Sequence, residues 1–380
     1  MSENVYIGIL LTATDLHVIF GKPTHDIKAV MPNGYFHIAP FAEGKYDCRI
    51  EFGNSSEAEN SLIAATKHIS EVKSQHGSVE FQRLGIASYG PILSLNPRDI
   101  SDDPNKNSNY GRISPQTIHE SLRGLPIYDI VTTWLKSFDC AVPLIINTDV
   151  TAGAIFEAQT RMKPPSLSEN YIQHSSDSVL AFLNIADGVG GSYVAGNKPV
   201  KSALHPEFGY LPTQVQENDP LRESLLVQPG KSRKTVFMED VLSIPQILKR
   251  AQRKQLSEVP EWDWRLISGY IAQLCASVTV LFAPSQIILQ GPIFREALDD
   301  DGQRLGLTGE VRRIFPTWLE SRSRKYPRFP ELTSTTYLSK PSQISWPNGK
   351  GEHVKLNPML GGALFMAMLE DVTTNDAQNG

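Results

Sequence analysis

Cysteine, long apolar runs and clusters of one charge are all scarce in this chain of 380 residues. Its three cysteines, Cys48, Cys140 and Cys275, are isolated and form no C-x-x-C pair. This excludes a thiolate-rich zinc site, argues against a disulfide scaffold and favours an intracellular protein. The net charge is -5 and no run of lysine and arginine is present, so composition gives no electrostatic reason to expect nucleic acid as a partner.

The first segment lacks the marks of an export signal or a membrane anchor. The stretch Met1–Phe20 has no basic flank and no small-residue cleavage site. Its apolar run is interrupted by Thr12, Thr14 and Asp15 and is too short to span a bilayer. We therefore expect a cytoplasmic protein with no membrane partner.

Composition and periodicity favour a globular α/β protein. Hydrophobic residues make up 40% and charged residues 20% of the chain, which is long enough for two domains. Short β-branched runs such as Val5–Leu11 and Val179–Ile185 alternate with segments of helical spacing. The longest of these, Trp264–Phe282, predicts a helix with one apolar stripe formed by Ile267, Ile271, Leu274, Val278 and Leu281.

The first candidate site lies where a buried strand meets a helix. Leu144–Ile146 is typical of a strand, and Asp149 falls at its carboxyl end, before a helix that starts with small residues. In open α/β sheets this location collects ligands. The alternative is that Asp149 only caps the helix.

A glycine-containing turn follows the strand Val179–Ile185. The stretch Asn184–Gly191 predicts a strand, a turn and a second strand that ends in the hairpin turn Gly196-Asn197. Backbone N–H groups in such a turn approach an anion closely. Glycine also serves hairpins for steric reasons alone, so the turn does not establish a phosphate site.

Two further segments contain polar groups suited to hydroxyl binding or proton transfer. His205-Pro-Glu207 lies in a loop bounded by proline and glycine, and Glu239 follows Phe237-Met238. Each segment taken alone is an ordinary polar turn.

Taken together, in this order and spacing, these segments resemble the ROK family of sugar kinases, in particular its bacterial fructokinases. The resemblance covers most of the chain, with extra loops inserted. It is carried by Leu84–Ile92, Asn109–Ser114, Asn147–Gln159, Asn184–Leu211, Phe237–Ile247, Ala283–Phe294 and Leu356–Leu369.

The resemblance implies two actin-like (ribonuclease H-like) α/β domains of the ROK/hexokinase type around a central cleft. We expect residues 1–148 and a C-terminal helix at about 359–371 in one domain, and residues 149–358 in the other. Asp149 matches the family's catalytic base. The positions that match substrate-binding residues are His205, Glu207, Glu239 and Glu157. A small polar or sugar-like ligand and a homodimer are compatible with the family.

The nucleotide-facing segments depart from the family pattern. The first phosphate turn reads Leu11-Thr-Ala-Thr-Asp15, with no glycine and with an aspartate in place of the usual lysine. The altered phosphate-loop positions are Thr12, Ala13, Asp15, Asp187, Gly188, Gly190 and Gly291. If Asp15 and Asp187 point into the cleft, one repulsion at about 4 Å and a dielectric of about 20 costs roughly 4 kcal/mol. That is about a thousandfold in nucleotide affinity.

The family's zinc loop is missing as well. Tyr210 replaces its first histidine, and no cysteine occurs between Cys140 and Cys275. We therefore expect no structural zinc and no other metal site.

These departures favour an enzyme that keeps the acceptor side of the cleft and has lost the donor side. It would use Asp149, His205, Glu207 and Glu239 for acid–base chemistry on a sugar-like molecule without a cofactor. The alternative is an ATP-dependent hexose kinase with Asp149 as base, which requires ATP and Mg²⁺. A further alternative is a non-catalytic pseudokinase that senses a sugar or scaffolds a partner.

Overall fold

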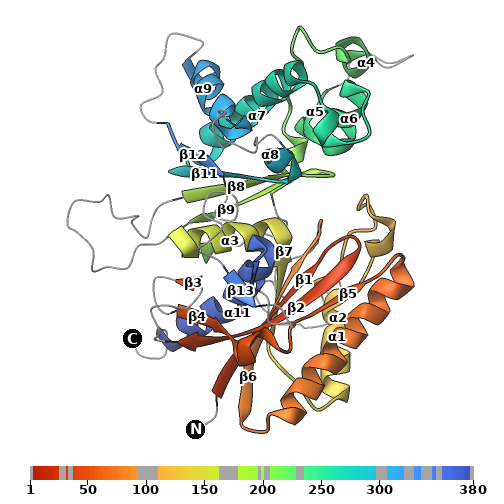
Figure 1. Cartoon of the computed structure of the whole chain (residues 1–380), viewed down its shortest axis with the longest axis vertical. Coiled ribbons are helices and arrows are strands. Elements are labelled where there is room, and N and C mark those ends of the chain that lie inside the picture. The colour runs from red at the N-terminus through yellow and green to blue at the C-terminus, as the bar shows by residue number, and fades with distance from the viewer. Residues whose placement is uncertain are drawn as a thin grey trace, which may run out of the picture. The chain divides into compact units, whose positions relative to one another are not determined.

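The computed structural model describes twelve stretches of the chain: 3–24, 31–32, 37–92, 110–161, 179–195, 198–200, 206–227, 235–296, 306–320, 329–334, 345–347 and 353–376. Its tertiary contacts divide the chain into two units (Figure 1). Unit 1 comprises Met1–His174, Asn197–His205 and Lys340–Gly380, and unit 2 comprises Ser175–Gly196 and Pro206–Ser339.

Unit 1 is built on a seven-stranded sheet with the order β3-β4-β2-β1-β6-β7, in which β5 pairs with β2. β1, β6 and β7 are parallel, and β1 and β2 form an antiparallel hairpin. β1 is buried along most of its length, which explains its continuous apolar run. The strands are β1 (Glu3–Leu11), β2 (Asp15–Thr24), β3 (Met31–Pro32), β4 (His37–Pro40), β5 (Cys48–Glu51), β6 (Val79–Ser88) and β7 (Leu144–Thr148). Unit 1 also holds β10 (Lys198–Pro199), β13 (Ser345–Pro347) and β14 (His353–Lys355).

Helices cover both faces of this sheet. α1 (Ser55–Gln75) and α2 (Ile127–Ser137) pack against each other and share one hydrophobic core with alternate residues of β1. α11 (Pro358–Asp376) lies against β1 and β6 and packs on α3 (Asp149–Arg161). The short 3-10 helices η1 (Phe41–Gly44) and η3 (Glu120–Leu122) lie in the connections.

Glycine allows α11 to approach its neighbours closely. A Cβ built at Gly85 of β6 would lie 2.0 Å from the Ala363 carbonyl oxygen, and one at Gly362 would lie 1.9 Å from the Ala152 carbonyl oxygen. The division of the chain by its tertiary contacts accordingly places α3 in unit 1. The predicted boundary at residue 148 had assigned this helix to the second domain.

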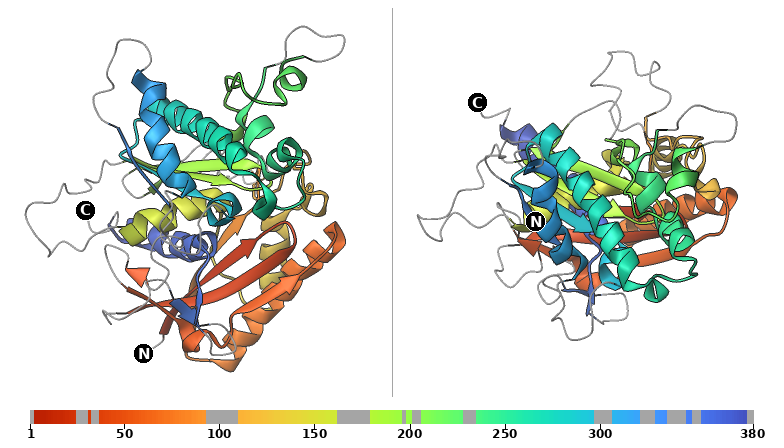
Figure 2. Two further views of the ribbon diagram at one scale, coloured as in Figure 1. Left: turned by 45° about the horizontal axis from the view of Figure 1, so that its top comes forward. Right: turned by 90° about the horizontal axis from the view of Figure 1, so that it is seen from above.

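Unit 2 has a smaller sheet in which β9, β8, β11 and β12 follow one another. β8 and β9 form an antiparallel hairpin, whereas β8, β11 and β12 are parallel. α7 and α9 pack side by side, as Figure 2 shows in its left view. The strands are β8 (Val179–Ile185), β9 (Val189–Ala195), β11 (Gln286–Gln290) and β12 (Glu331–Ser334). The helices are α4 (Arg222–Leu226), α5 (Met238–Leu242), α6 (Ile244–Ala251), α7 (Glu261–Phe282), α8 (Pro292–Glu296) and α9 (Leu307–Glu320), with 3-10 helices η4 (Phe208–Tyr210) and η5 (Leu256–Glu258).

α7 is the central helix of the unit 2 core. Among the described residues it is the one helix long and apolar enough to cross a bilayer, and 72% of its apolar window is buried inside the protein. Ile267, Ile271 and Leu274 of the predicted stripe are fully buried. Leu281 is not part of the core, because it is 58% exposed in the last turn, where Phe282 instead stacks on Tyr193.

The close approach of α11 to β6 yields a stability prediction. Gly85→Ala should lower the free energy of unfolding by about 1–3 kcal/mol, because the new methyl group meets backbone that cannot rotate away. Chemical unfolding monitored by circular dichroism measures this change. Gly77→Ala, at a described position with open space around its Cβ, is the matched control and should cost nothing. Equal stability of the two variants would contradict the packing.

Candidate functional site

Three parallel strands of unit 1 end in register and bring three segments together. Leu11 pairs with Ser88, and Ser88 pairs with Thr148. The residues that follow are therefore neighbours: the turn Thr12–Thr14 after β1, the segment Tyr89–Ile92 after β6, and Asp149 after β7. We call these segments the carboxyl edge. It is the position at which open α/β sheets bind ligands.

Asp149 is the first residue of α3, and Thr148 is the residue that caps this helix. The Thr148 hydroxyl accepts a hydrogen bond from the Thr151 N–H at 3.3 Å and lies 2.9 Å from the Thr151 hydroxyl. Asp149 Oδ1 accepts a local bond from the next amide, Val150 N–H, at 2.8 Å. The capping alternative is therefore fulfilled by Thr148. Asp149 is half-buried at a helix N-terminus, where the helix dipole attracts negative charge.

The negative charge of Asp15, the first residue after the turn between β1 and β2, is neutralised by neighbouring side chains. The Asp15 carboxylate accepts hydrogen bonds from Arg49 Nε at 2.9 Å and Nη2 at 2.5 Å, and a third from the Thr12 hydroxyl. His17 Nε2 lies 3.4 Å from the same carboxylate. Burial opposes ionisation of Asp15, but the Thr12 hydrogen bond and the charges of His17 and Arg49 outweigh it and lower its pKa.

The repulsion estimated from the sequence applies to an Asp15 that points into the cleft without a compensating charge, and here Arg49 compensates that charge. The Asp15 side chain is 8% exposed and its charge is paired with an arginine from β5. Arg49 was not singled out in the sequence, because it lies 34 residues from Asp15 and belongs to no recognisable motif.

In unit 2, the turn between β8 and β9 has the expected hairpin form. The Ala186 N–H donates to the Gly188 carbonyl oxygen at 2.9 Å, and Gly190 pairs with Asn184 in the ladder. Asp187 is exposed at the tip of this turn. The turn is anchored from outside by the Ile244 N–H, which donates to the Ala186 carbonyl oxygen at 2.8 Å.

The predicted carboxylates Glu207 and Glu239 come together in unit 2. Glu239 Oε2 accepts a hydrogen bond from the Val189 N–H at 3.3 Å and lies 2.8 Å from the position of a Cβ at Gly209. Burial raises the pKa of Glu239, and the negative charges of Glu207 and Asp240 raise it further against the Val189 hydrogen bond. The two glutamates are here called the carboxylate pair.

The remaining predicted residues are placed as follows. His205 lies outside the described residues. Glu157 is fully buried on α3, so this position does not support its substrate contact, which stays a prediction. At Gly291, φ is +134° and a Cβ would lie 1.9 Å from the Ile185 carbonyl oxygen. Close packing of β11 on β8 alone therefore requires a glycine at this position.

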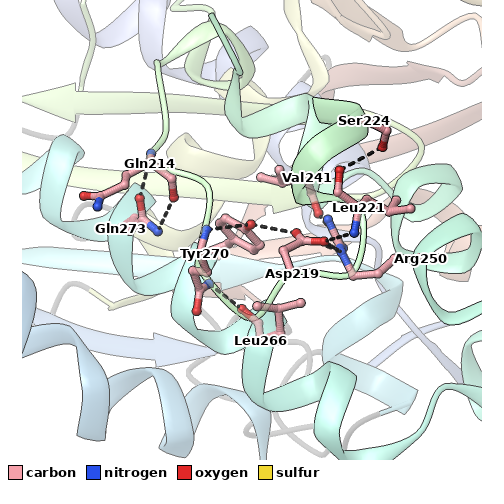
Figure 3. A network of polar contacts seen from close by, with 10 residues as sticks. Gln214, Asp219, Leu221, Ser224, Val241, Arg250, Leu266, Tyr270 and Gln273 are labelled. Carbon is pink, nitrogen blue, oxygen red and sulfur yellow. Dashed lines mark hydrogen bonds and ion pairs between the residues drawn. The ribbon is translucent and has the colours of Figure 1, made fainter. Parts of the chain in front are cut away.

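The segment that carries Glu207 is fastened to α7 by a ladder of polar contacts (Figure 3). Gln273 Oε1 accepts from the Gln214 N–H at 3.1 Å, and its Nε2 donates to the Gln214 carbonyl oxygen at 3.0 Å. One helical turn away, the Tyr270 hydroxyl accepts from the Gln216 N–H at 3.1 Å. The side chains of Gln273 and Tyr270 thus satisfy backbone hydrogen-bonding groups of this segment, as a neighbouring β-strand would.

A buried ion pair completes this ladder. Arg250 Nε lies 3.2 and 3.1 Å from the Asp219 carboxylate oxygens, and both side chains are fully buried (Figure 3). Tyr270 donates its hydroxyl proton to Asp219 at 2.7 Å, and Arg250 Nη1 donates to the Val241 carbonyl oxygen at 3.1 Å. Because Val241 lies on α5, which also carries Glu239, this network connects both members of the carboxylate pair.

The described residues contain no group of three or more His, Cys, Asp or Glu side chains arranged to hold a metal ion. The expected absence of zinc stays a prediction. Asp219 of this network lies in the stretch between Glu207 and Glu239 in which the resemblance placed the zinc loop, and its partners Arg250 and Tyr270 lie on α6 and α7. Sequence reasoning missed this network, because its ion pair joins residues 31 positions apart.

Sequence comparison identifies relatives of this chain. No family model matches the chain. It is 26% identical over 215 residues to a fructokinase of Pediococcus pentosaceus and 26% identical over 231 residues to a putative fructokinase of Bacillus subtilis (strain 168). These alignments cover 56% and 60% of this chain, and 63% and 66% of the relatives, so they span less than two thirds of either relative.

Solved structures share the fold over nearly the whole chain. A ROK hexokinase from Thermus thermophilus superposes with a TM-score of 0.57 at 14% identity, covering 97% of this chain and 99% of the other. A ROK family glucokinase from Streptomyces griseus, in complex with glucose and AMPPNP, gives 0.53 at 15% identity, covering 96% and 99%.

The fold is therefore the two-domain, actin-like fold of the ROK hexokinases and glucokinases, as predicted. Sequence and fold together make the chain a divergent relative of the ROK sugar kinases.

The buried ion pair between Arg250 and Asp219 provides a test of what stabilises unit 2. Arg250→Met should lower the free energy of unfolding by about 3–5 kcal/mol, because it leaves the Asp219 carboxylate buried without its cation. Urea unfolding measures the difference. The control is Arg265→Met, which breaks an exposed pair with Glu261 and should cost about 1 kcal/mol or less. A chelator should leave the wild-type Tm unchanged, whereas a large drop would show that a metal performs this task.

The raised pKa of Glu239 yields a pH prediction. A raised folded-state pKa means that the folded protein holds the proton more tightly than the unfolded chain. The contribution of Glu239 to stability is therefore complete below its ordinary value of 4.5 and is lost as the pH rises through the raised value. Glu239→Gln should reduce the fall in unfolding free energy over this window, as measured by urea unfolding from pH 4 upward.

The control for this prediction is Glu223→Gln, which alters an exposed glutamate on α4. It should leave the pH profile of the wild type unchanged. A profile of Glu239→Gln that overlays the wild type would contradict the burial of Glu239.

Proposed function

We propose that this protein is a sugar kinase that transfers a phosphoryl group from magnesium-bound ATP to a hydroxyl of a hexose. The observation that carries the proposal is the position of Asp149. It is the first residue after the parallel edge strand β7, at a helix N-terminus, and the Thr148 hydroxyl caps the helix. The relatives named fructokinase support the same reaction class.

The residues at the β1–β2 turn fit the triphosphate of a nucleotide. The aspartate that replaces the usual lysine is buried and paired with Arg49, so it adds no free negative charge to this turn. The Thr12 hydroxyl belongs to the same network. The objection based on two uncompensated carboxylates therefore concerns Asp187 alone.

Asp187 is exposed, so water screens its charge strongly. At about 4 Å and a dielectric near 80, one unit-charge repulsion costs about 1 kcal/mol, or roughly fivefold in affinity. This is far below the thousandfold loss expected for a carboxylate in a dry cleft. A nucleotide with its magnesium ion tolerates such a penalty.

Asp149 would act as the base. Its carboxylate would accept the proton of the attacking sugar hydroxyl. Bound ATP would supply the phosphoryl group and, with magnesium, neutralise the charge that develops on it.

A second candidate function is acid–base chemistry on a sugar-like molecule without a phosphoryl donor. The carboxylate pair favours it specifically, because a glutamate of raised pKa beside a second glutamate is the combination of acid and base that isomerisation or hydrolysis requires. Conversion of a hexose in the absence of nucleotide, lost in Glu239→Gln, would establish this function instead.

The kinase proposal predicts the effect of one substitution. Asp149→Asn should lower sugar-dependent ADP formation at least about 100-fold, because the amide cannot accept the hydroxyl proton. The dissociation constant for the sugar should stay within about threefold, since the amide retains hydrogen-bonding atoms of the same size. Steady-state kinetics and calorimetry measure the two quantities.

Asp187→Asn is the matched carboxylate-to-amide control. It should keep turnover and bind ATP several-fold more tightly, since it removes one repulsion from the β8–β9 turn. Unchanged ADP formation in Asp149→Asn would contradict the assignment of the base and favour a non-catalytic sensor or scaffold.

A further inference from the structure

Tyr89 lies in the middle of the carboxyl edge. It follows β6, the strand between β1 and β7, and its N–H donates to the Leu11 carbonyl oxygen at 3.0 Å. Neighbouring strands are about 5 Å apart, so the backbone of Tyr89 lies one strand spacing from Asp149 on one side and from Thr12 on the other.

A histidine reaches the same place from a distant part of the chain. The rings of Tyr89 and His119 meet edge to face, with centroids 4.4 Å apart and planes at 82°. Both side chains are half-buried. His119 therefore joins the carboxyl edge, although its sequence neighbourhood gives no sign of a site.

Two side-chain hydrogen bonds hold the segment around His119 over the strand ends. The Thr117 hydroxyl donates to the Gly90 carbonyl oxygen at 3.0 Å, and the Ser121 hydroxyl donates to the Ala13 carbonyl oxygen at 2.9 Å. His119 lies between these two anchors. One fastens it to the segment after β6, and the other fastens it to the turn after β1.

We propose that His119 is a substrate-binding residue of unit 1, positioned by Tyr89 and hydrogen-bonded to a sugar hydroxyl next to the one that Asp149 deprotonates. An imidazole offers one donor and one acceptor when neutral, which matches the pairing that a sugar hydroxyl requires. The aromatic ring of Tyr89 fixes the imidazole plane by edge-to-face packing. This inference rests on the proposed sugar substrate and adds a specificity-determining residue to it.

The molecule contains a matched control for this pair. Tyr46 and His76 also meet edge to face, with centroids 5.0 Å apart and planes at 82°, and both are half-buried in unit 1. Their bond joins His76 Nε2 and the Tyr46 hydroxyl at 2.6 Å. His76 lies beside the first residue of β6, whereas Tyr89 follows the last one, so the two pairs are about 30 Å apart along the strand.

The test compares histidine variants of the two pairs by calorimetric titration with D-fructose, D-glucose and D-mannose. His119→Ala should weaken binding of the preferred sugar about fivefold to tenfold, the loss of about one hydrogen bond. His119→Gln, which keeps a donor and an acceptor, should recover part of the affinity. His76→Ala should bind the sugar as the wild type does, even where its Tm is lower.

Sugar affinity within twofold of wild type in both His119 variants would overturn the inference. Equal loss of affinity in His119→Ala and His76→Ala would overturn it too, because the effect would then be one of general stability. A wild type that binds sugar through His119 but forms no ADP would contradict the kinase proposal and leave the inference standing. A wild type that binds none of the three sugars would contradict both.

Discussion

The common end point of three parallel strands is the constraint on which the site of unit 1 depends. Leu11, Ser88 and Thr148 lie in one row across β1, β6 and β7. Hydrogen bonding fixes this row, and a slip of one residue would turn each following side chain to the other face of the sheet. Asp149, Tyr89 and the Thr12–Thr14 turn are adjacent because the row is level. The close packing of α11 at Gly85 covers the sheet behind them.

Two arginines pair with aspartates in regions where this chain departs from the family pattern. Arg49 pairs with the aspartate that stands in place of a lysine at the first phosphate turn. Arg250 pairs with Asp219 in the segment where a zinc loop was expected to be missing. In both cases a carboxylate and an arginine from a neighbouring element form a contact that burial strengthens. Both arginines thus compensate an aspartate in a region where the sequence departs from the family pattern.

Local pattern predicted the fold and part of the site. Asp149 was found because a buried strand followed by small residues marks a strand end, and the hairpin around Asp187 was found from its glycines. The approach of Glu207 to Glu239 was expected only through the family resemblance. Arg49 and Arg250 were missed, since their partners lie on other elements and leave no periodic signal. Leu281 was misplaced because helical periodicity does not show where the covering core ends.

The proposed kinase activity requires that the protein still uses a phosphoryl donor. Mass spectrometry of a hexose panel incubated with the full chain, with and without magnesium-bound ATP, tests it directly. If the protein is a sugar kinase, one hexose gains a single phosphoryl group only when the nucleotide is present. A hexose that is converted equally well without nucleotide, or a panel that stays unchanged while ATP is present, would contradict it.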